Sequence, residues 1–111
     1  MVYTLVARLH ASSEENAKKV QAKLVEAAGV YRKDKGTLGW YVMQDAKDPL
    51  KFTIVERYVK PEDLQTHLNN PYWPTFDPYV KPLLKEDIDL TFHHEMDVAV
   101  PNQDSVNFKG L

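Results

Sequence analysis

Four segments of the chain combine apolar and polar residues in the pattern of β-strands. In residues 2–10, 37–44 and 52–58, apolar side chains occupy both alternating sets of positions, so both faces of these strands are apolar. Residues 87–96 alternate strictly between apolar and polar side chains, which predicts an edge strand that is half exposed.

Two helical regions are expected between these strands. Ser12 and Ser13 are candidate N-caps, and apolar residues recur at helical spacing after them to about residue 33, which predicts an amphipathic helix. A second helix is expected to open at Pro61 and to end before Pro71. The repeated prolines that follow predict short helical pieces, the last of them at about residues 77–84.

The order of these elements, βαββαβ, predicts an α+β fold, namely a ferredoxin-like antiparallel sheet with both helices on one face. The helices can cover only one face, whereas three strands are apolar on both, and an apolar patch of that size is typical of an interaction surface. We therefore expect a homodimer in which a second sheet covers the open face. Residues 1–96 are expected to form one domain, and residues 97–111 a tail with little core of its own.

The candidate chemistry centres on one histidine. His67 lies late in the second helix, and the stop at Asn69-Asn70-Pro71 places it in the last turn, where we expect its side chain at the mouth of a pocket. An imidazole that titrates near neutral pH can act as a general base towards a phenol or an acidic C–H group. The alternative is a partly buried helix residue that bonds to a backbone carbonyl.

Aromatic rings follow this histidine. Tyr72 and Trp73 can stack on a planar substrate, since ligand pockets are lined mainly by such rings, or they can belong to an ordinary core. Phe76 is expected to pack beside them. Glu56 shares a strand face with Tyr58 and is either paired within the protein or an acceptor towards the substrate.

These features together resemble a known family. A strand that ends in Glu56-Arg57-Tyr58, a late helical His67, and an Asn-Pro turn followed by aromatic rings are similar to the antibiotic biosynthesis monooxygenase family. Its members are small dimeric α+β barrels, and many oxidise quinols, anthrones or similar small molecules with O2 and use no flavin, haem or metal. The resemblance covers about residues 2–96.

The resemblance implies roles for individual side chains. His67 would be the base or a hydrogen-bond partner of the substrate, and Tyr72 and Trp73 the aromatic wall of the pocket. Four further side chains are candidates for lining it: Trp40, Tyr58, Phe76 and His94.

Metal and cofactor motifs are missing from the sequence. The chain has no Cys, which removes thiolate nucleophiles and Cys-metal sites. His93 and His94 are adjacent in a strand, so their rings point to opposite faces and cannot bind one ion. No glycine-rich strand–turn–helix motif occurs among the four Gly. The Asn and the haem-binding His of haem-degrading relatives have no counterparts here, so we expect neither metal nor cofactor.

The composition limits the partners. A net charge of -2 lacks the basic excess that nucleic-acid binding requires, and no apolar run is long enough to cross a membrane or to act as a signal peptide. The absence of Cys fits a reducing compartment, so we expect a cytoplasmic protein whose partners are a small-molecule substrate, O2 and a second copy. The alternative function is a non-catalytic small-molecule-binding or stress-response dimer, which shares the pocket and does not need His67.

Overall fold

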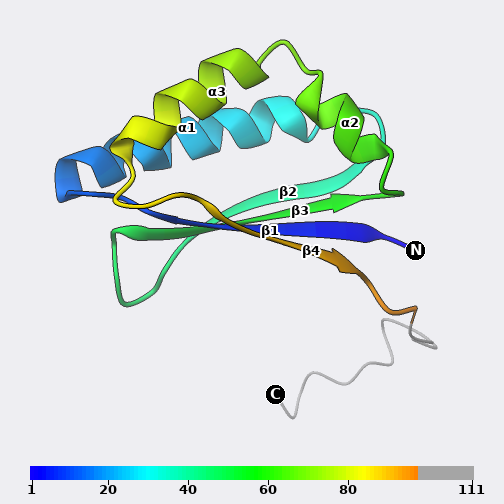
Figure 1. Ribbon diagram of the computed structural model, residues 1–111, viewed down its shortest axis with the longest axis horizontal. Helices are drawn as coiled ribbons and strands as arrows, with labels where there is room; N and C mark the ends of the chain where they lie inside the picture. The colour runs from blue at the N-terminus through cyan, green and yellow to red at the C-terminus, as the bar shows by residue number, and fades with distance from the viewer. Residues whose placement is uncertain (98–111) are drawn as a thin grey trace.

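The computed structural model of the protein describes residues 1–97, and its helices and strands follow the expected order with one extra helix (Figure 1). The elements are β1 (Tyr3–His10), α1 (Glu14–Tyr31), β2 (Thr37–Gln44), β3 (Lys51–Tyr58), α2 (Asp63–Leu68), α3 (Trp73–Val80), the 3-10 helix η1 (Lys81–Leu83) and β4 (Asp89–His94). The strands form one antiparallel sheet in the order β2-β3-β1-β4, and the three α-helices lie on one face of it. The predicted ferredoxin-like α+β fold is confirmed. Of the predicted tail, residues 98–111 lie outside the described part of the chain.

Helix α1 forms as its sequence predicts. The Ser13 side chain accepts a hydrogen bond from the backbone N–H of Asn16, and two acidic residues in the first turn favour the positive end of the helix dipole. The apolar stripe faces the sheet and is buried throughout: Ala17, Val20, Leu24, Ala27, Ala28 and Tyr31. The helix ends at Tyr31, slightly before the expected end.

The region after α2 forms short helical pieces as expected, but helix α3 differs from the expected piece in its bounds. It runs through Pro74 and Pro78 and is followed by η1, whereas the expected piece was residues 77–84. Pro74 stands in the first turn, where a backbone N–H has no partner within the helix, and Pro78 removes a single internal hydrogen bond. Burial of Phe76 and Val80 against the core offsets that loss.

The two faces of the sheet differ in what covers them. The helix-covered face holds the core, which includes Leu5 of β1, Trp40 of β2 and Ile54 of β3. The other face, here called the open face, is centred on a cross-strand row formed by Val6, Val55 and Tyr41. Met43 and Arg57 belong to the same face by register, and Tyr41 and Met43 are about half exposed.

Gly36 makes the turn that enters β2. Its φ of 87° lies in the left-handed region, which favours glycine, and its carbonyl accepts a 2.9 Å hydrogen bond from the N–H of Val59. A Cβ at this position would lie 2.2 Å from Cγ of Asp63, the first residue of α2. The loop therefore passes directly against the start of that helix.

Candidate active site

An apolar cavity of about 270 Å³ lies between the sheet and helices α2 and α3. Trp40, Trp73 and Phe76 contribute aromatic surface to its walls. Leu90 and Phe92 of edge strand β4 also line it and are about half exposed, so the cavity meets solvent beside this strand.

Three ionisable side chains line this cavity, and two of them, a glutamate and a histidine, lie close together; the third, Asp77 of α3, forms a 3.0 Å ion pair with Lys81. Glu56 projects from β3 and His67 from α2, and both line the cavity while being only 5% and 3% exposed. Nε2 of His67 lies 3.6 Å from Oε1 of Glu56. On the other side of the ring, Nδ1 lies 4.0 Å from Oδ2 of Asp34, which belongs to the loop after α1. The imidazole therefore stands between two carboxyl groups.

Burial changes the protonation of this pair in opposite directions. Desolvation disfavours both charged forms, so it lowers the pKa of His67 to about 4 and raises the pKa of Glu56 to about 7. At neutral pH the imidazole is thus neutral, which is the form that a base requires. Perturbation of this kind in a cavity is typical of a functional site.

Glu56 is held by its neighbours in the core. The hydroxyl of Tyr58 donates a 2.6 Å hydrogen bond to Oε1, and this contact lowers the pKa of Glu56 against the larger effect of burial. The indole N–H of Trp40 also favours the charged carboxylate, although it forms no hydrogen bond of normal geometry. Burial raises the pKa of Tyr58, so its hydroxyl keeps its proton and remains a donor.

Four of the residues predicted from sequence meet at this cavity. Trp40, Trp73 and Phe76 line it together with His67. The position of His67 within the last turn of its helix agrees with the sequence, but the expected location at the pocket mouth is wrong. Helix α2 turns this side chain inwards, where the rings of Tyr31 and Trp73 lie 4.0 and 5.7 Å from it, centroid to centroid.

The other three predicted residues lie outside the lining. Tyr72 turns towards α1, where its hydroxyl donates to Glu26 and its ring lies 4.7 Å from Nζ of Lys23. Tyr58 is fully buried and reaches the cavity through its bond to Glu56. His94 is exposed at the end of β4, next to the ring of Tyr3.

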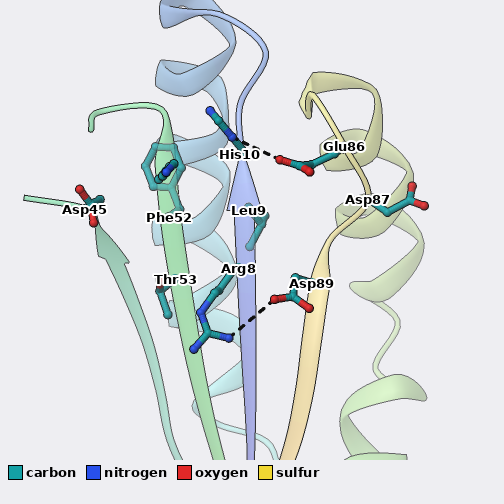
Figure 2. Close-up of a pocket in the computed structure, with 10 residues that line it drawn as sticks. Arg8, Leu9, His10, Asp45, Phe52, Thr53, Glu86, Asp87 and Asp89 are labelled. Carbon is teal, nitrogen blue, oxygen red and sulfur yellow. Dashed lines mark ion pairs between the residues drawn. The ribbon is translucent and has the colours of Figure 1, made fainter. Parts of the chain in front are cut away.

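A second hollow, of about 460 Å³, lies at the C-terminal end of β1 (Figure 2). It is polar, and two ion pairs cross it, one between Arg8 and Asp89 at 3.8 Å and one between His10 and Glu86 at 3.3 Å. The sequence offered no partner for His10, because Glu86 follows it by a long interval and approaches only in the folded chain. The buried His–Glu pair belongs to the other cavity.

Residues 1–97 contain no group of three His, Asp or Glu side chains arranged to hold a metal ion. The strand register places His93 opposite Thr4 and His94 opposite Tyr3, on opposite faces of the sheet as predicted. Within the same residues, no helix is long and apolar enough to span a bilayer.

Asp34 is the residue of this site that the sequence analysis missed. It stands between Lys33 and Lys35 in the sequence, and a run of charged residues of this kind is typical of an exposed loop. The side chain is nonetheless mostly buried, with only 12% of its surface exposed, and Asn70 donates a 2.7 Å hydrogen bond to its Oδ1. The one signal available in the sequence is a carboxyl group two residues before a glycine, and it is weak.

The fold and this cavity define a small α+β domain of a small-molecule-binding kind. Residues 2–77, more than half of the chain, match the family described as Antibiotic biosynthesis monooxygenase, and the protein belongs to this family. Family membership supports a monooxygenase-type function.

Solved structures agree with this assignment. A Deinococcus radiodurans protein provisionally described as an antibiotic biosynthesis monooxygenase is similar, with a TM-score of 0.79 and 27% identity over 90% of this chain and 97% of that one. Rv0793 from Mycobacterium tuberculosis shares the fold, with a TM-score of 0.81 and 19% identity over 90% of this chain and 100% of that one. PA3566 from Pseudomonas aeruginosa does so with a TM-score of 0.78 and 21% identity over 86% and 95% of the two chains. Among curated proteins, none matches this sequence.

Proposed function

We propose that this protein is a cofactor-independent monooxygenase that oxidises a small aromatic or lipophilic metabolite, such as a quinol or an anthrone, with O2. The observation that carries the proposal is a neutral His67 and a raised-pKa Glu56 that share one apolar cavity. Family membership supports the monooxygenase class. The substrate and the absence of a cofactor belong to the proposal.

The first step is removal of a proton from the substrate. His67 takes the proton from a phenol or an activated C–H group, and the Glu56 carboxylate, 3.6 Å from Nε2, stabilises the imidazolium that forms. The apolar walls exclude water and hold the planar ring close to the base. The product of this step is a substrate anion rich enough in electrons to react with O2.

The substrate itself supplies all the electrons for the second step. For a CH2 group between aromatic rings, the overall change is CH2 + O2 → C=O + H2O. One oxygen atom enters the product and the other leaves as water, while the two C–H bonds provide the four electrons that reduce O2. No external reductant is needed, and the two protons end in water.

The size of the cavity narrows the substrate class. Its volume of about 270 Å³ is close to the lower limit of ligand pockets, which span roughly 300–1,000 Å³. Substrates of one to three fused rings, which include simple quinols and anthrones, fit this space best. Larger ring systems would extend past Leu90 and Phe92 into solvent.

We also propose that the protein acts as a homodimer. The open face presents Val6, Tyr41, Met43 and Val55, and none of the helices in the described residues 1–97 covers them. A second copy that packs its own open face there would bury these side chains. The cavity lies on the opposite side of the sheet, so each subunit would keep its own.

Oxygen consumption tests the proposed reaction. Purified protein is mixed with one-ring and two-ring quinols, an anthrone and an oxidisable lipid, and O2 uptake is compared with binding measured by calorimetry. We expect uptake with at least one ring compound and incorporation of one ¹⁸O atom from ¹⁸O2 into its product. Tight binding of a ring compound without oxygen uptake by any of them would contradict the proposal and favour the non-catalytic binding protein.

A further inference from the structure

Asp34 is a buried carboxyl group that the proposed reaction does not use. It does not line the cavity, but its Oδ2 lies 4.0 Å from Nδ1 of His67. Within residues 1–97, neither of these two atoms has a hydrogen-bond partner, although both are buried. Unpaired buried polar atoms are rare in folded proteins, so two of them that face each other call for a functional explanation.

The carboxyl group is oriented from its other side. Asn70 donates a 2.7 Å hydrogen bond to Oδ1 of Asp34, and its own Oδ1 accepts a 2.9 Å bond from the N–H of Tyr72. Asn70 is in turn placed by the stop of helix α2, which carries His67. The carboxyl group and the imidazole that it faces are therefore held by one short piece of chain.

We infer that Asp34 is a positioning residue, whose carboxylate holds His67 as the tautomer that carries its proton on Nδ1 and so leaves Nε2 to accept a proton beside Glu56. The kinetic consequence of this inference rests on the proposed base role of His67. The tautomer itself does not depend on that role.

Electrostatics favour this tautomer. An N–H group on the Asp34 side points its positive end at a carboxylate, and the lone pair on Nε2 then faces Glu56, which is favourable below pH 7, where the Glu56 carboxyl group is mostly protonated. The separation of 4.0 Å is too long for a direct hydrogen bond. Contacts of this kind are often long in free enzymes and shorten when the substrate binds, so a small rotation of the ring would complete the contact.

The other titratable groups near the ring do not compete for this proton in weakly acidic solution. Tyr31 packs edge-on against the imidazole, and burial raises its pKa, as it does that of Tyr58 behind Glu56, so both phenols stay protonated. Burial also raises the pKa of Glu56 to about 7, so at about pH 6 most of this group is protonated and attracts an N–H on Nε2 only weakly. Burial raises the pKa of Asp34 as well, from its ordinary value of 3.8, and the hydrogen bond from Asn70 opposes this shift. Because its ordinary pKa is the lower of the two, Asp34 is the carboxylate that selects the tautomer.

Nuclear magnetic resonance of histidine labelled with ¹³C and ¹⁵N measures the tautomer directly, at about pH 6 and without substrate. The signals of His67 are identified by their loss in His67→Gln. We expect the Nδ1–H form in the parent and the Nε2–H form in Asp34→Asn. In that variant Asn70 still donates to the oxygen of the new amide, which turns the NH2 group of that amide towards the ring. An Nε2–H form in the parent, or an unchanged tautomer in Asp34→Asn, would overturn the inference.

Kinetics provide the second measurement. In Asp34→Asn we expect kcat to fall by about tenfold or more with KM unchanged, because the residue acts through His67 and does not line the cavity. Asp45→Asn is the matched control. Asp45 accepts two backbone hydrogen bonds in the turn before β3, far from the imidazole, and its change should alter neither the tautomer nor kcat.

A second variant covers the case in which Asp34→Asn does not fold. Asn70→Ser releases Oδ1 of Asp34 without a change of charge, and we expect a mixture of the two His67 tautomers. A tautomer identical to that of the parent would overturn the inference. If the parent oxidises no substrate, the proposed function fails, whereas the tautomer measurement still decides the role of Asp34.

Discussion

Glu56 and Glu95 are two glutamates on opposite faces of one sheet, and their surroundings give them opposite properties. Glu56 is buried beside the cavity, and burial raises its pKa to about 7. On the open face, Glu95 accepts two hydrogen bonds from Arg57, at 2.7 and 2.9 Å, and another from Thr4, and these contacts lower its pKa to about 2.

The comparison shows how one strand can separate two tasks. Glu56 and Arg57 are adjacent in β3, so their side chains point to opposite faces. On the helix-covered face, a carboxyl group without a cationic partner is available to exchange protons near pH 7. On the open face, a paired carboxylate stays charged at every physiological pH and serves structure. Burial under the helices therefore determines whether a glutamate can exchange protons near pH 7 or stays charged, since the residue type is the same at both positions.

The largest expected effect comes from a charge introduced in the centre of the open face, which tests whether this face is a dimer interface. Val55→Glu places a carboxylate beside Val6 in the row that a second sheet would cover, and we expect the dimer to separate completely into monomers. Light scattering after size-exclusion chromatography would show the mass fall from twice 12.8 kDa to 12.8 kDa.

The control for this variant is Val25→Glu on the outer side of α1, where the side chain is 61% exposed. It makes the same chemical change away from the open face and should leave the mass unaltered. A parent protein that is already a monomer at micromolar concentration would show that the open face is not a dimer interface.

On the helix-covered face, His67→Ala should lower turnover by roughly 100-fold or more, the size expected for the loss of a positioned acid–base group. The protein should stay folded and keep its oligomeric state, since the proposed dimer interface lies on the other side of the sheet. Oxygen uptake and thermal melting must be measured on the same preparation.

His10→Ala removes an imidazole from the polar hollow instead and should keep full turnover. If His67→Ala lost stability while each folded molecule stayed fully active, His67 would be a packing residue, and the substrate would ionise without it.

Glu56→Gln should change the pH dependence of stability. The pKa of Glu56 is near 4.5 when unfolded and about 7 when folded, so its contribution to stability is fully present below pH 4.5 and is lost as pH rises to 7. Glutamine stays neutral, so the variant should gain about 2–3 kcal/mol relative to the parent between pH 5 and pH 8.

Urea unfolding of both proteins at the two pH values measures this difference. His67 works in the other direction, because its pKa is lowered from 6.5 to about 4 and its contribution is lost as pH falls through that range. Since both proteins contain His67, its effect largely cancels. A stability difference that does not vary with pH would show that Glu56 is not desolvated.

The smallest expected effect concerns the mouth of the cavity. Leu90 is 48% exposed, so truncation in Leu90→Ala removes contact with part of the substrate, worth about 1 kcal/mol. We expect KM to rise by about fivefold with kcat unchanged. Leu38→Ala, at 47% exposure and outside the cavity, is the matched control. An equal rise in KM in both variants would show that the mouth of the cavity does not lie at Leu90.

Periodicity predicted the parts of the fold that obey simple burial rules. The stripe of α1, from Ala17 to Tyr31, and the placement of Trp40 and Tyr41 on opposite faces of β2 follow directly from spacing. Which of these two faces the helices cover did not follow from the sequence. The bounds of helix α3 did not follow either, because proline acts as a breaker only where it removes bonds that burial does not replace.

The site was harder to predict than the fold. His67 and Trp73 were predicted because they stand on either side of an Asn-Pro turn that the sequence marks, and Trp40 was predicted from the family resemblance. Tyr72 stands directly beside Trp73 in the chain, yet its ring turns to α1 and lies outside the cavity lining. Asp34 meets its partner Asn70 across 36 positions, and contacts of this length are a product of the tertiary fold.

Substitution of Gly36 would affect the contact between Asp34 and His67. Gly36 lies two residues after Asp34, and its turn touches Asp63, the first residue of the helix that carries His67. Any other residue is strained at a φ of 87° and must also displace the Asp63 carboxylate, so either the loop or the first turn of α2 has to move. Variation at position 36 would therefore retune the distance between a carboxyl group and an imidazole without altering any residue that touches substrate. A directed-evolution library that varies position 36 would therefore sample different distances between Asp34 and His67.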